Sequence, residues 1–300
     1  MAQLRLTFNA SLKEIIDMAS TSKADNVIRQ VADGLAAAPG IDAIVLGGSR
    51  ATGTATESSD IDIGIYYNES FDMAAFRALG MALDDARRPD CITDIGEWGP
   101  WINGGGWLTV DGMAVDLLLR DTGKVARCID DCIAGKLTID YQCGHPFGFV
   151  NSIYMGEVYL CQPLCEHTGA LAALKRRLEP YPETYRREAM AKFLWECDFS
   201  LMCGRKAASK RDVLYASGSL FRSAVALVYA LYAHYRMYCL NEKGCLKRLV
   251  ASGVALPDGL PDGVAATLEG ACALTGDNIA QAFDAVQRMY EDVRRICAQQ

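Results

Sequence analysis

The chain has 300 residues, of which 51% are hydrophobic and 22% charged, and its formal net charge is −7. A chain of this length can bury a large core and is near the length at which one core divides into two, so we expect two domains. Proteins that bind nucleic-acid backbones usually carry a basic surface, so the acidic balance disfavours an enzyme acting on long nucleic acid. The first residues lack a basic segment followed by an apolar core, which predicts a cytoplasmic protein without an export signal.

The first part of the chain alternates helical and strand patterns. Apolar residues at helical spacing predict helices over 24–38, 71–86 and 121–135, and β-forming runs predict strands over 41–46, from Asp60 onward and over 91–95. Asp111-Gly112 between two further β-forming runs predicts a hairpin with a two-residue turn. These elements indicate an α+β domain over residues 1–137, with a mixed sheet of about five strands and helices on one side.

A glycine-serine turn and two aspartates follow the first strand. Gly47, Gly48 and Ser49 precede a polar spacer and then Asp60-Ile61-Asp62, which begins an apolar strand. Strand residues two apart point to the same face, so Asp60 and Asp62 repel each other unless a cation lies between them. Glycines let the backbone approach an anion closely, which favours phosphate at the turn. The alternative is an ordinary turn entering a strand whose acidic residues face water.

A third aspartate lies in the returning strand of the predicted hairpin. Asp116 stands within the apolar run Val115–Leu119, where an unpaired carboxylate is costly to bury. We therefore expect it to face a cation. The alternative is an edge strand whose aspartate faces solvent.

Together, the turn, the spacer and the Asp-x-Asp pattern resemble the signature of the nucleotidyltransferase superfamily, which includes polymerase beta-like palms and antibiotic adenylyltransferases. The resemblance implies that Asp60, Asp62 and Asp116 are the catalytic and metal-binding carboxylates and hold two Mg²⁺ ions. It also implies that Gly47, Gly48 and Ser49 bind the terminal phosphates of ATP or another nucleoside triphosphate. The glycine spacing matches neither a P-loop nor a dinucleotide-binding fingerprint.

Residues 138–168 are irregular and rich in Gly, Pro, His and Tyr, and we expect them to connect the first domain to a helical domain over residues 169–300. The chain has twelve cysteines, which we expect to be reduced and mostly buried. Zinc remains an alternative for one group of soft ligands, although their spacing fits no common structural site. The members of this group are Cys143, His145, Cys161, Cys165 and His167.

The second half of the chain is almost wholly helical in pattern, with helices expected over 169–179, 183–208, 211–240, 241–252 and 276–298. The apolar stretch Ala224–Ala233 is too short to span a bilayer, so we expect no membrane association. Asp212, Tyr215, Ser219 and Arg222 recur at steps of three and four, which places them along one face of a helix.

This polar stripe is expected to line a ligand cleft or, alternatively, to face solvent. We predict that Tyr215 and Arg222 bind the nucleotide. Lys206 and Lys210 lie near the ends of the neighbouring helices, where an ammonium group can reach a triphosphate, or they are ordinary surface lysines.

Further segments resemble bacterial nucleotidyltransferase-domain proteins with a helical C-terminal region, namely Leu117–Asp121, Gly144–Phe149, Tyr154–Glu157 and Leu240–Gly244. The resemblance implies Mg²⁺-dependent transfer of a nucleoside monophosphate to a hydroxyl of a small molecule such as an antibiotic, with release of pyrophosphate. AMP from ATP is the leading candidate for the transferred group. The alternatives are a protein-modifying, antitoxin-like nucleotidyltransferase and a nucleotide-binding module without turnover. The acceptor, the preferred base and the oligomeric state are not indicated by the sequence.

Overall fold

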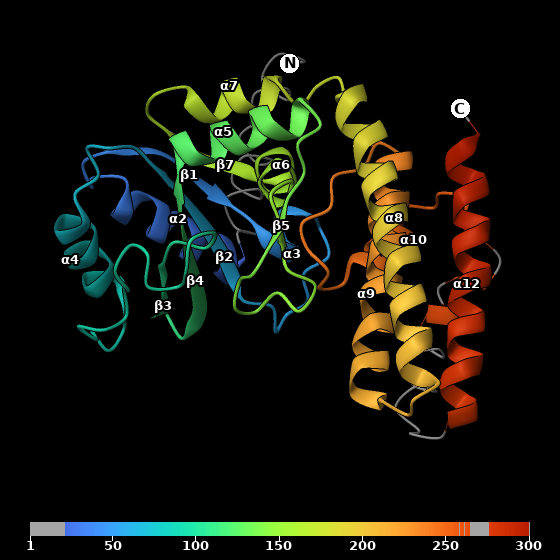
Figure 1. The fold of residues 1–300 in the computed structure, drawn as a ribbon. Helices are drawn as coiled ribbons and strands as arrows, with labels where there is room; N and C mark the ends of the chain where they lie inside the picture. Colours follow the sequence, from blue (N-terminus) through green and yellow to red (C-terminus); the bar gives the residue numbers. More distant parts are fainter. Residues whose placement is uncertain (1–21, 258, 261, 265–275, 300) are drawn as a thin grey trace, which may run out of the picture. The chain divides into compact units, whose positions relative to one another are not determined.

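The computed structural model describes residues 22–257, 259–260, 262–264 and 276–299, and it has the predicted α+β fold (Figure 1). In chain order, its elements are α2 (Lys23–Leu35), β1 (Ile41–Leu46), α3 (Gly48–Ala51), β2 (Ile61–Tyr67), α4 (Met73–Leu83), β3 (Gly105–Val110), β4 (Met113–Asp121), α5 (Thr122–Ile133), β5 (Ile139–Asp140), β6 (Phe149–Val150), α6 (Ile153–Leu160), β7 (Gln162–Glu166), α7 (Ala170–Arg176), α8 (Glu183–Ala208), α9 (Val213–His234), α10 (Cys245–Ala251) and α12 (Gly276–Ala298).

These elements form two compact units. The first contains the described residues up to Gly123 together with Leu160–Ala173, and the second contains Lys124–Tyr159 and the described residues from Leu174 onward. Residues 124–137 therefore group with the second unit, and the predicted connector over 138–168 contributes ordered elements to both. The functional division at residues 137 and 168 stays a prediction.

A five-stranded mixed sheet in the order β3-β4-β2-β1-β7 forms the first unit. Strands β2 and β4 run parallel, and the other neighbouring pairs run antiparallel. The predicted strand over 91–95 is wrong, because the chain forms one isolated bridge at Ile92 and then turns away at Asp94–Gly96. The fifth strand is β7 instead, which comes from the predicted connector and pairs with β1.

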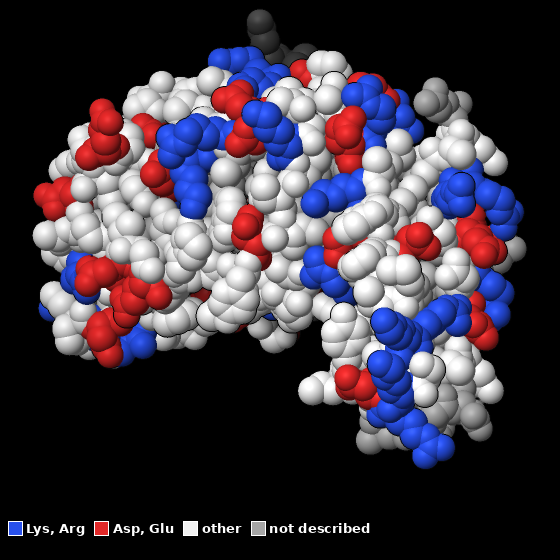
Figure 2. Space-filling model, viewed as in Figure 1, with Lys and Arg blue, Asp and Glu red and all other residues white. Residues whose placement is uncertain are grey.

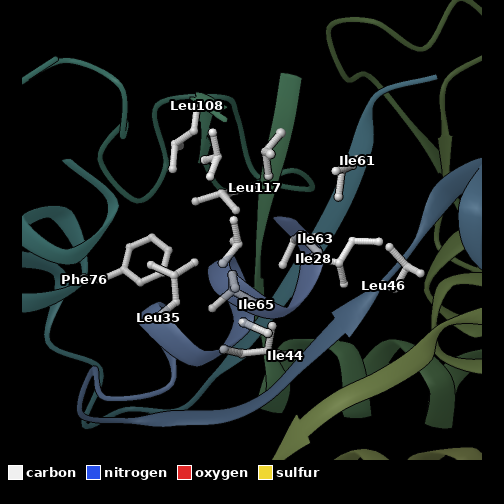
Figure 3. Packing of buried hydrophobic residues seen from close by; sticks show 14 of the residues in the cluster. Ile28, Leu35, Ile44, Leu46, Ile61, Ile63, Ile65, Phe76, Leu108 and Leu117 are labelled. Carbon is white, nitrogen blue, oxygen red and sulfur yellow. The ribbon is translucent and has the colours of Figure 1, made fainter. Parts of the chain in front are cut away.

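The core of this unit lies on one face of the sheet, where alternate side chains of β2 pack with α2 and α4. Figure 3 shows part of this cluster, and its labelled members are Ile28, Leu35, Ile44, Leu46, Ile61, Ile63, Ile65, Phe76, Leu108 and Leu117. Burying such a side chain contributes about 1.5–3 kcal/mol. Because strand residues alternate between faces, Asp62 points to the face opposite this core.

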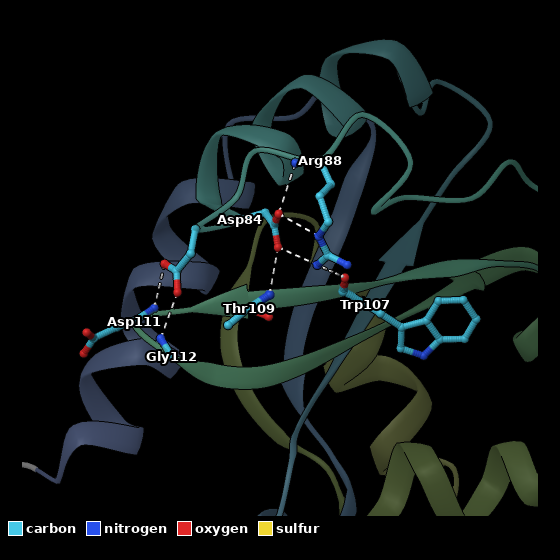
Figure 4. A network of polar contacts seen from close by, with 7 residues as sticks. Asp84, Arg88, Trp107, Thr109, Asp111 and Gly112 are labelled. Atoms are coloured by element: carbon cyan, nitrogen blue, oxygen red, sulfur yellow. Dashed lines mark hydrogen bonds and ion pairs between the residues drawn. The ribbon is translucent and has the colours of Figure 1, made fainter.

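The β3–β4 hairpin turns at Asp111-Gly112, as predicted. Both residues have positive φ, 49° and 70°, which is the geometry that an Asp-Gly pair adopts readily in a two-residue hairpin turn. The carboxylate of Asp85 accepts hydrogen bonds from both turn amides, at 3.0 and 2.8 Å (Figure 4). Asp84 accepts another from the Thr109 amide at 2.9 Å. These bonds fasten the segment that follows α4 to the hairpin.

Three long helices, α8, α9 and α12, pack together in the second unit. The bounds predicted for α8 and α12 are confirmed, while α9 ends at His234, before the predicted residue 240. Helix α9 is long and apolar enough to cross a membrane by length and composition alone, a test that buried core helices also pass. Half of the most apolar 18-residue stretch of α9 is buried in this structure. The helix is longer than the apolar stretch Ala224–Ala233 because it begins at Val213 and ends one residue after Ala233.

Candidate active site

Asp62 and Asp116 are neighbours across the two central strands. They are register partners in the parallel β2–β4 pair, so their side chains project from the same face of the sheet. Both residues are half-buried, whereas the flanking residues Ile61, Ile63 and Val115 are buried on the opposite face. The fold therefore places two carboxylates side by side on the face of the sheet opposite the core.

The glycine-serine turn lies directly against this pair. Gly48 has φ of +57°, and a Cβ atom added there would lie 1.8 Å from Oδ2 of Asp62. The Gly47 amide donates a hydrogen bond of 2.8 Å to the carbonyl oxygen of Asp62. The Gly47 amide is therefore engaged within the fold, and the phosphate contacts expected at Gly47, Gly48 and Ser49 stay predictions.

Asp60 precedes β2 and is exposed. The guanidinium of Arg50 donates hydrogen bonds to the carbonyl oxygens of Ser59, at 2.6 Å, and Asp60, at 3.2 Å. Arg50 therefore holds the backbone that leads into β2. Sequence reasoning did not assign this role to Arg50, and its place beside the turn was the only signal.

An aromatic residue flanks the carboxylates on the other side. Trp107 of β3 is the register partner of Asp116, and it is 55% exposed. Its ring packs on that of Trp98, with 4.5 Å between the ring centroids. A two-residue turn at Asp111-Gly112 requires this pairing, so the sequence contained the signal, although the residue was not singled out.

Residues 28–100 match the family model described as Nucleotidyltransferase domain. The chain contains a nucleotidyltransferase domain. The matched segment includes the turn, Asp60 and Asp62, and Asp116 lies beyond it. Among solved structures, the chain is similar to a nucleotidyltransferase-like protein from Exiguobacterium sibiricum, with 13% identity, coverage of 89% of this chain and 74% of that chain, and a TM-score of 0.44. No curated protein matches the chain.

Carboxylate oxygens are the ligands that Mg²⁺ prefers, so the Asp62–Asp116 pair fits a divalent cation by its chemistry. Within the described part of the chain, no group of three or more His, Cys, Asp or Glu side chains is arranged to hold a metal. The complete three-carboxylate set is therefore not assembled in this structure. A metal role for Asp60 and the binding of two ions stay predictions.

The Cys and His residues for which zinc was an alternative form no metal-binding group among the described residues either. His145 lies against Glu242, with 3.4 Å between Nδ1 and Oε2, and Cys165 contacts His167 at 3.4 Å. All eleven cysteines in the described residues are free. Burial raises the pKa of Cys245 to about 11, so this side chain stays a neutral thiol at physiological pH.

The predicted nucleotide-binding residues of the second unit divide into two groups. Tyr215 and Arg222 line a pocket of about 350 Å³ between α8 and α9. Asp212 caps the beginning of α9, where its carboxylate accepts a hydrogen bond from the Tyr215 amide at 3.2 Å. Lys206 and Lys210 are exposed, and the pocket lining found among the described residues does not include them. Figure 2 shows Lys and Arg side chains gathered over the end of α8 and α9 where the two helices join. Contact of Lys206, Lys210, Tyr215 and Arg222 with a nucleotide stays a prediction.

Proposed function

We propose that this protein transfers a nucleoside monophosphate to a hydroxyl group of a small molecule and releases pyrophosphate. ATP, which would supply AMP, is the first donor to test. The observation that carries the proposal is the pairing of Asp62 and Asp116 on one sheet face, directly against the Gly48 turn. The presence of a nucleotidyltransferase domain supports it. We also propose that the reaction takes place in the cytoplasm.

Asp62 and Asp116, together with Asp60, would hold Mg²⁺, which when bound neutralises the triphosphate and the charge that develops at the α-phosphorus. The turn at Gly48 and Ser49 holds the terminal phosphates, because a glycine backbone allows a close approach. The acceptor hydroxyl oxygen forms a bond to the α-phosphorus, the bond between the α-phosphorus and the bridging oxygen breaks, and Asp116 accepts the hydroxyl proton. The exposed Trp107 ring offers a flat apolar surface beside Asp116.

The helical unit favours a small acceptor over a protein acceptor. Antitoxin-like, protein-modifying nucleotidyltransferases tend to be little more than the catalytic domain, whereas this chain adds a unit with the long helices α8, α9 and α12. We propose a hydroxyl-bearing compound, with aminoglycosides and lincosamides as the first compounds to test. The acidic net charge of −7 is compatible with a cationic acceptor.

Pyrophosphate release tests the proposal. The purified protein is incubated with ATP, Mg²⁺ and a panel of hydroxyl compounds, and chelation of Mg²⁺ should abolish release. Asp62→Asn and Asp116→Asn should each lower the rate by about 100-fold or more, which corresponds to about 2.7 kcal/mol in the activation barrier. Asp111→Asn is the matched control, because Asn tolerates the positive φ at this exposed turn and should preserve the rate.

Failure of every nucleoside triphosphate to release pyrophosphate across the panel would reject the proposal. Full activity in both Asp→Asn variants would reject the assigned site. A nucleotide adduct on a co-purified protein, detected by intact mass, would favour the protein-modifying alternative. Nucleotide binding that survives Asp116→Asn without any turnover would favour a binding module.

A further inference from the structure

The pocket between α8 and α9 belongs wholly to the helical unit. Its lining comes from these two helices, so its shape does not depend on the carboxylates of the sheet. Helices α8 and α9 pack against each other, and the exposed Gly218 of α9 is part of the pocket lining. A Cβ atom added at Gly218 would meet no atom of the described residues within 4 Å.

Two aromatic side chains form walls of this pocket. Phe199 comes from α8 and Tyr215 from α9, and both are about half exposed. The Phe199 ring is held by stacking on Trp195, with 5.1 Å between centroids and 11° between ring planes. Exposed aromatic rings in a pocket favour a flat partner, because stacking buries apolar area on both sides. The walls therefore suit a planar ring.

An ion pair forms the polar part of the lining. The Nε atom of Arg222 donates to the carboxylate of Glu196, and these two residues are the charged members of the lining. Arg222 is held further by the Phe147 carbonyl, to which Nη1 donates at 3.1 Å, and by the Phe147 ring, whose centroid lies 4.9 Å away.

The pair presents both kinds of hydrogen-bonding group to a ligand. A guanidinium has five N–H donors, so Arg222 keeps donors beyond those two bonds, and the Glu196 carboxylate keeps acceptor capacity. Because their charges cancel, the pocket does not favour a free phosphate or a bare cation.

We infer that this pocket binds a neutral planar ring that carries neighbouring hydrogen-bond donors and acceptors, as nucleobases do. The ring lies between Phe199 and Tyr215, and its polar edge faces the Glu196–Arg222 pair. All of these residues belong to the second unit, so the inference does not rest on the proposed transfer reaction. Arg222 therefore contacts a ring edge and not a triphosphate.

Calorimetric titration of the full chain with adenosine, guanosine and cytidine tests this inference, with ribose as the ligand that lacks the ring. At least one nucleoside should bind saturably and ribose should not. Gly218→Leu fills the pocket at a position where the side chain meets open space, and it should weaken that binding about tenfold or more. The control Ala191→Leu adds the same side chain at an exposed α8 position outside the described lining, and should change the affinity by less than about twofold.

Asp62→Asn separates this site from the proposed active site, because binding in the pocket should survive it unchanged. A second measurement keeps the test valid if Gly218→Leu fails to fold. Cys203 lines the pocket and is half-buried, so the bound nucleoside should slow its alkylation in the wild-type protein, as followed by peptide mass mapping. The inference is overturned if none of the three nucleosides binds at millimolar concentration, if Gly218→Leu binds like the wild type, or if binding leaves Cys203 alkylation unchanged.

Discussion

Gly48 is the position at which one atom of side chain would alter the site most directly. Its backbone lies in the left-handed region, and the carboxylate of Asp62 occupies the space that a Cβ atom would need. The glycine therefore serves two purposes, since it allows the turn and leaves room for the carboxylate. Arg50 adds a third constraint by holding the backbone of Asp60.

Gly48→Ala should therefore displace Asp62 as well as strain the turn. The left-handed conformation alone costs a non-glycine residue about 1–2 kcal/mol. Gly53→Ala is the matched control, because Gly53 has φ of +71° but an added Cβ would meet no described atom within 4 Å. Both variants should unfold at lower temperature, whereas Gly48→Ala alone should lower the pyrophosphate release rate by about tenfold or more. Equal rates in the two variants would show that the Asp62 carboxylate does not need this space.

At the scale of elements, the end of α4 and the β3–β4 hairpin are joined by carboxylates. Asp84 is buried, and it accepts hydrogen bonds from the Thr109 amide and from Arg88, which also donates to the carbonyl oxygen of Trp107 (Figure 4). This network supports β3, from which Trp107 projects beside its register partner Asp116 on β4. The Arg88 hydrogen bonds hold the pKa of Asp84 well below its ordinary value.

A carboxylate whose pKa is lowered by folding stabilises the protein fully above its unfolded pKa of about 3.9, and this contribution is lost as the pH falls toward the folded pKa. Asp84→Asn should therefore lower the free energy of unfolding by about 1.5–3 kcal/mol at pH 7. The difference from the wild type should shrink below about pH 4. Urea unfolding between pH 7 and pH 3 measures this.

Asp90→Asn is the control for the Asp84 variant, because Asp90 is an exposed aspartate of the same segment. Its effect should stay within about 0.5 kcal/mol throughout the pH range. A stability difference for Asp84→Asn that does not change with pH would contradict the assigned origin.

At the scale of the whole molecule, the helical unit depends on contacts between residues far apart in the chain. Gly204 of α8 lies against Phe283 of α12 and Ser219 of α9, and a Cβ atom added there would lie 2.3 Å from the Phe283 ring. Phe283 is fully buried, so its ring has little room to move. Gly218, on the neighbouring helix, faces open space instead.

The same substitution should therefore have opposite effects at these two glycines. Alanine is favoured over glycine in a helix by about 1 kcal/mol, so Gly218→Ala should raise the thermal unfolding temperature. Gly204→Ala should lower it, because overpacking costs about 1–3 kcal/mol and exceeds the helical gain. Circular dichroism measures both transitions, and a stabilised Gly204→Ala variant would show that the three helices can separate at little cost.

Much of the fold and the hairpin beside the site were predictable from local patterns. The bounds of α8 and α12 follow from apolar spacing, and the Asp111-Gly112 turn follows from the positive φ that these residues tolerate. That turn determines which residues of β3 and β4 pair, and hence the place of Trp107 beside Asp116. The placement of Asp62 beside Asp116 was expected from the family resemblance, because no local rule pairs two strands separated by a helix.

The sequence by itself determined most of the long helices, the strands that flank the site and which face of each is apolar, because these properties depend on residues a few positions apart. Only the tertiary structure decided that β7 completes the sheet while residues 91–95 form a single bridge, since β7 joins β1 across more of the chain than any local pattern covers. It also decided that Arg222 pairs with Glu196. The partner of a buried charge is selected by the packing of the entire fold, in which every desolvated group must find its hydrogen bonds.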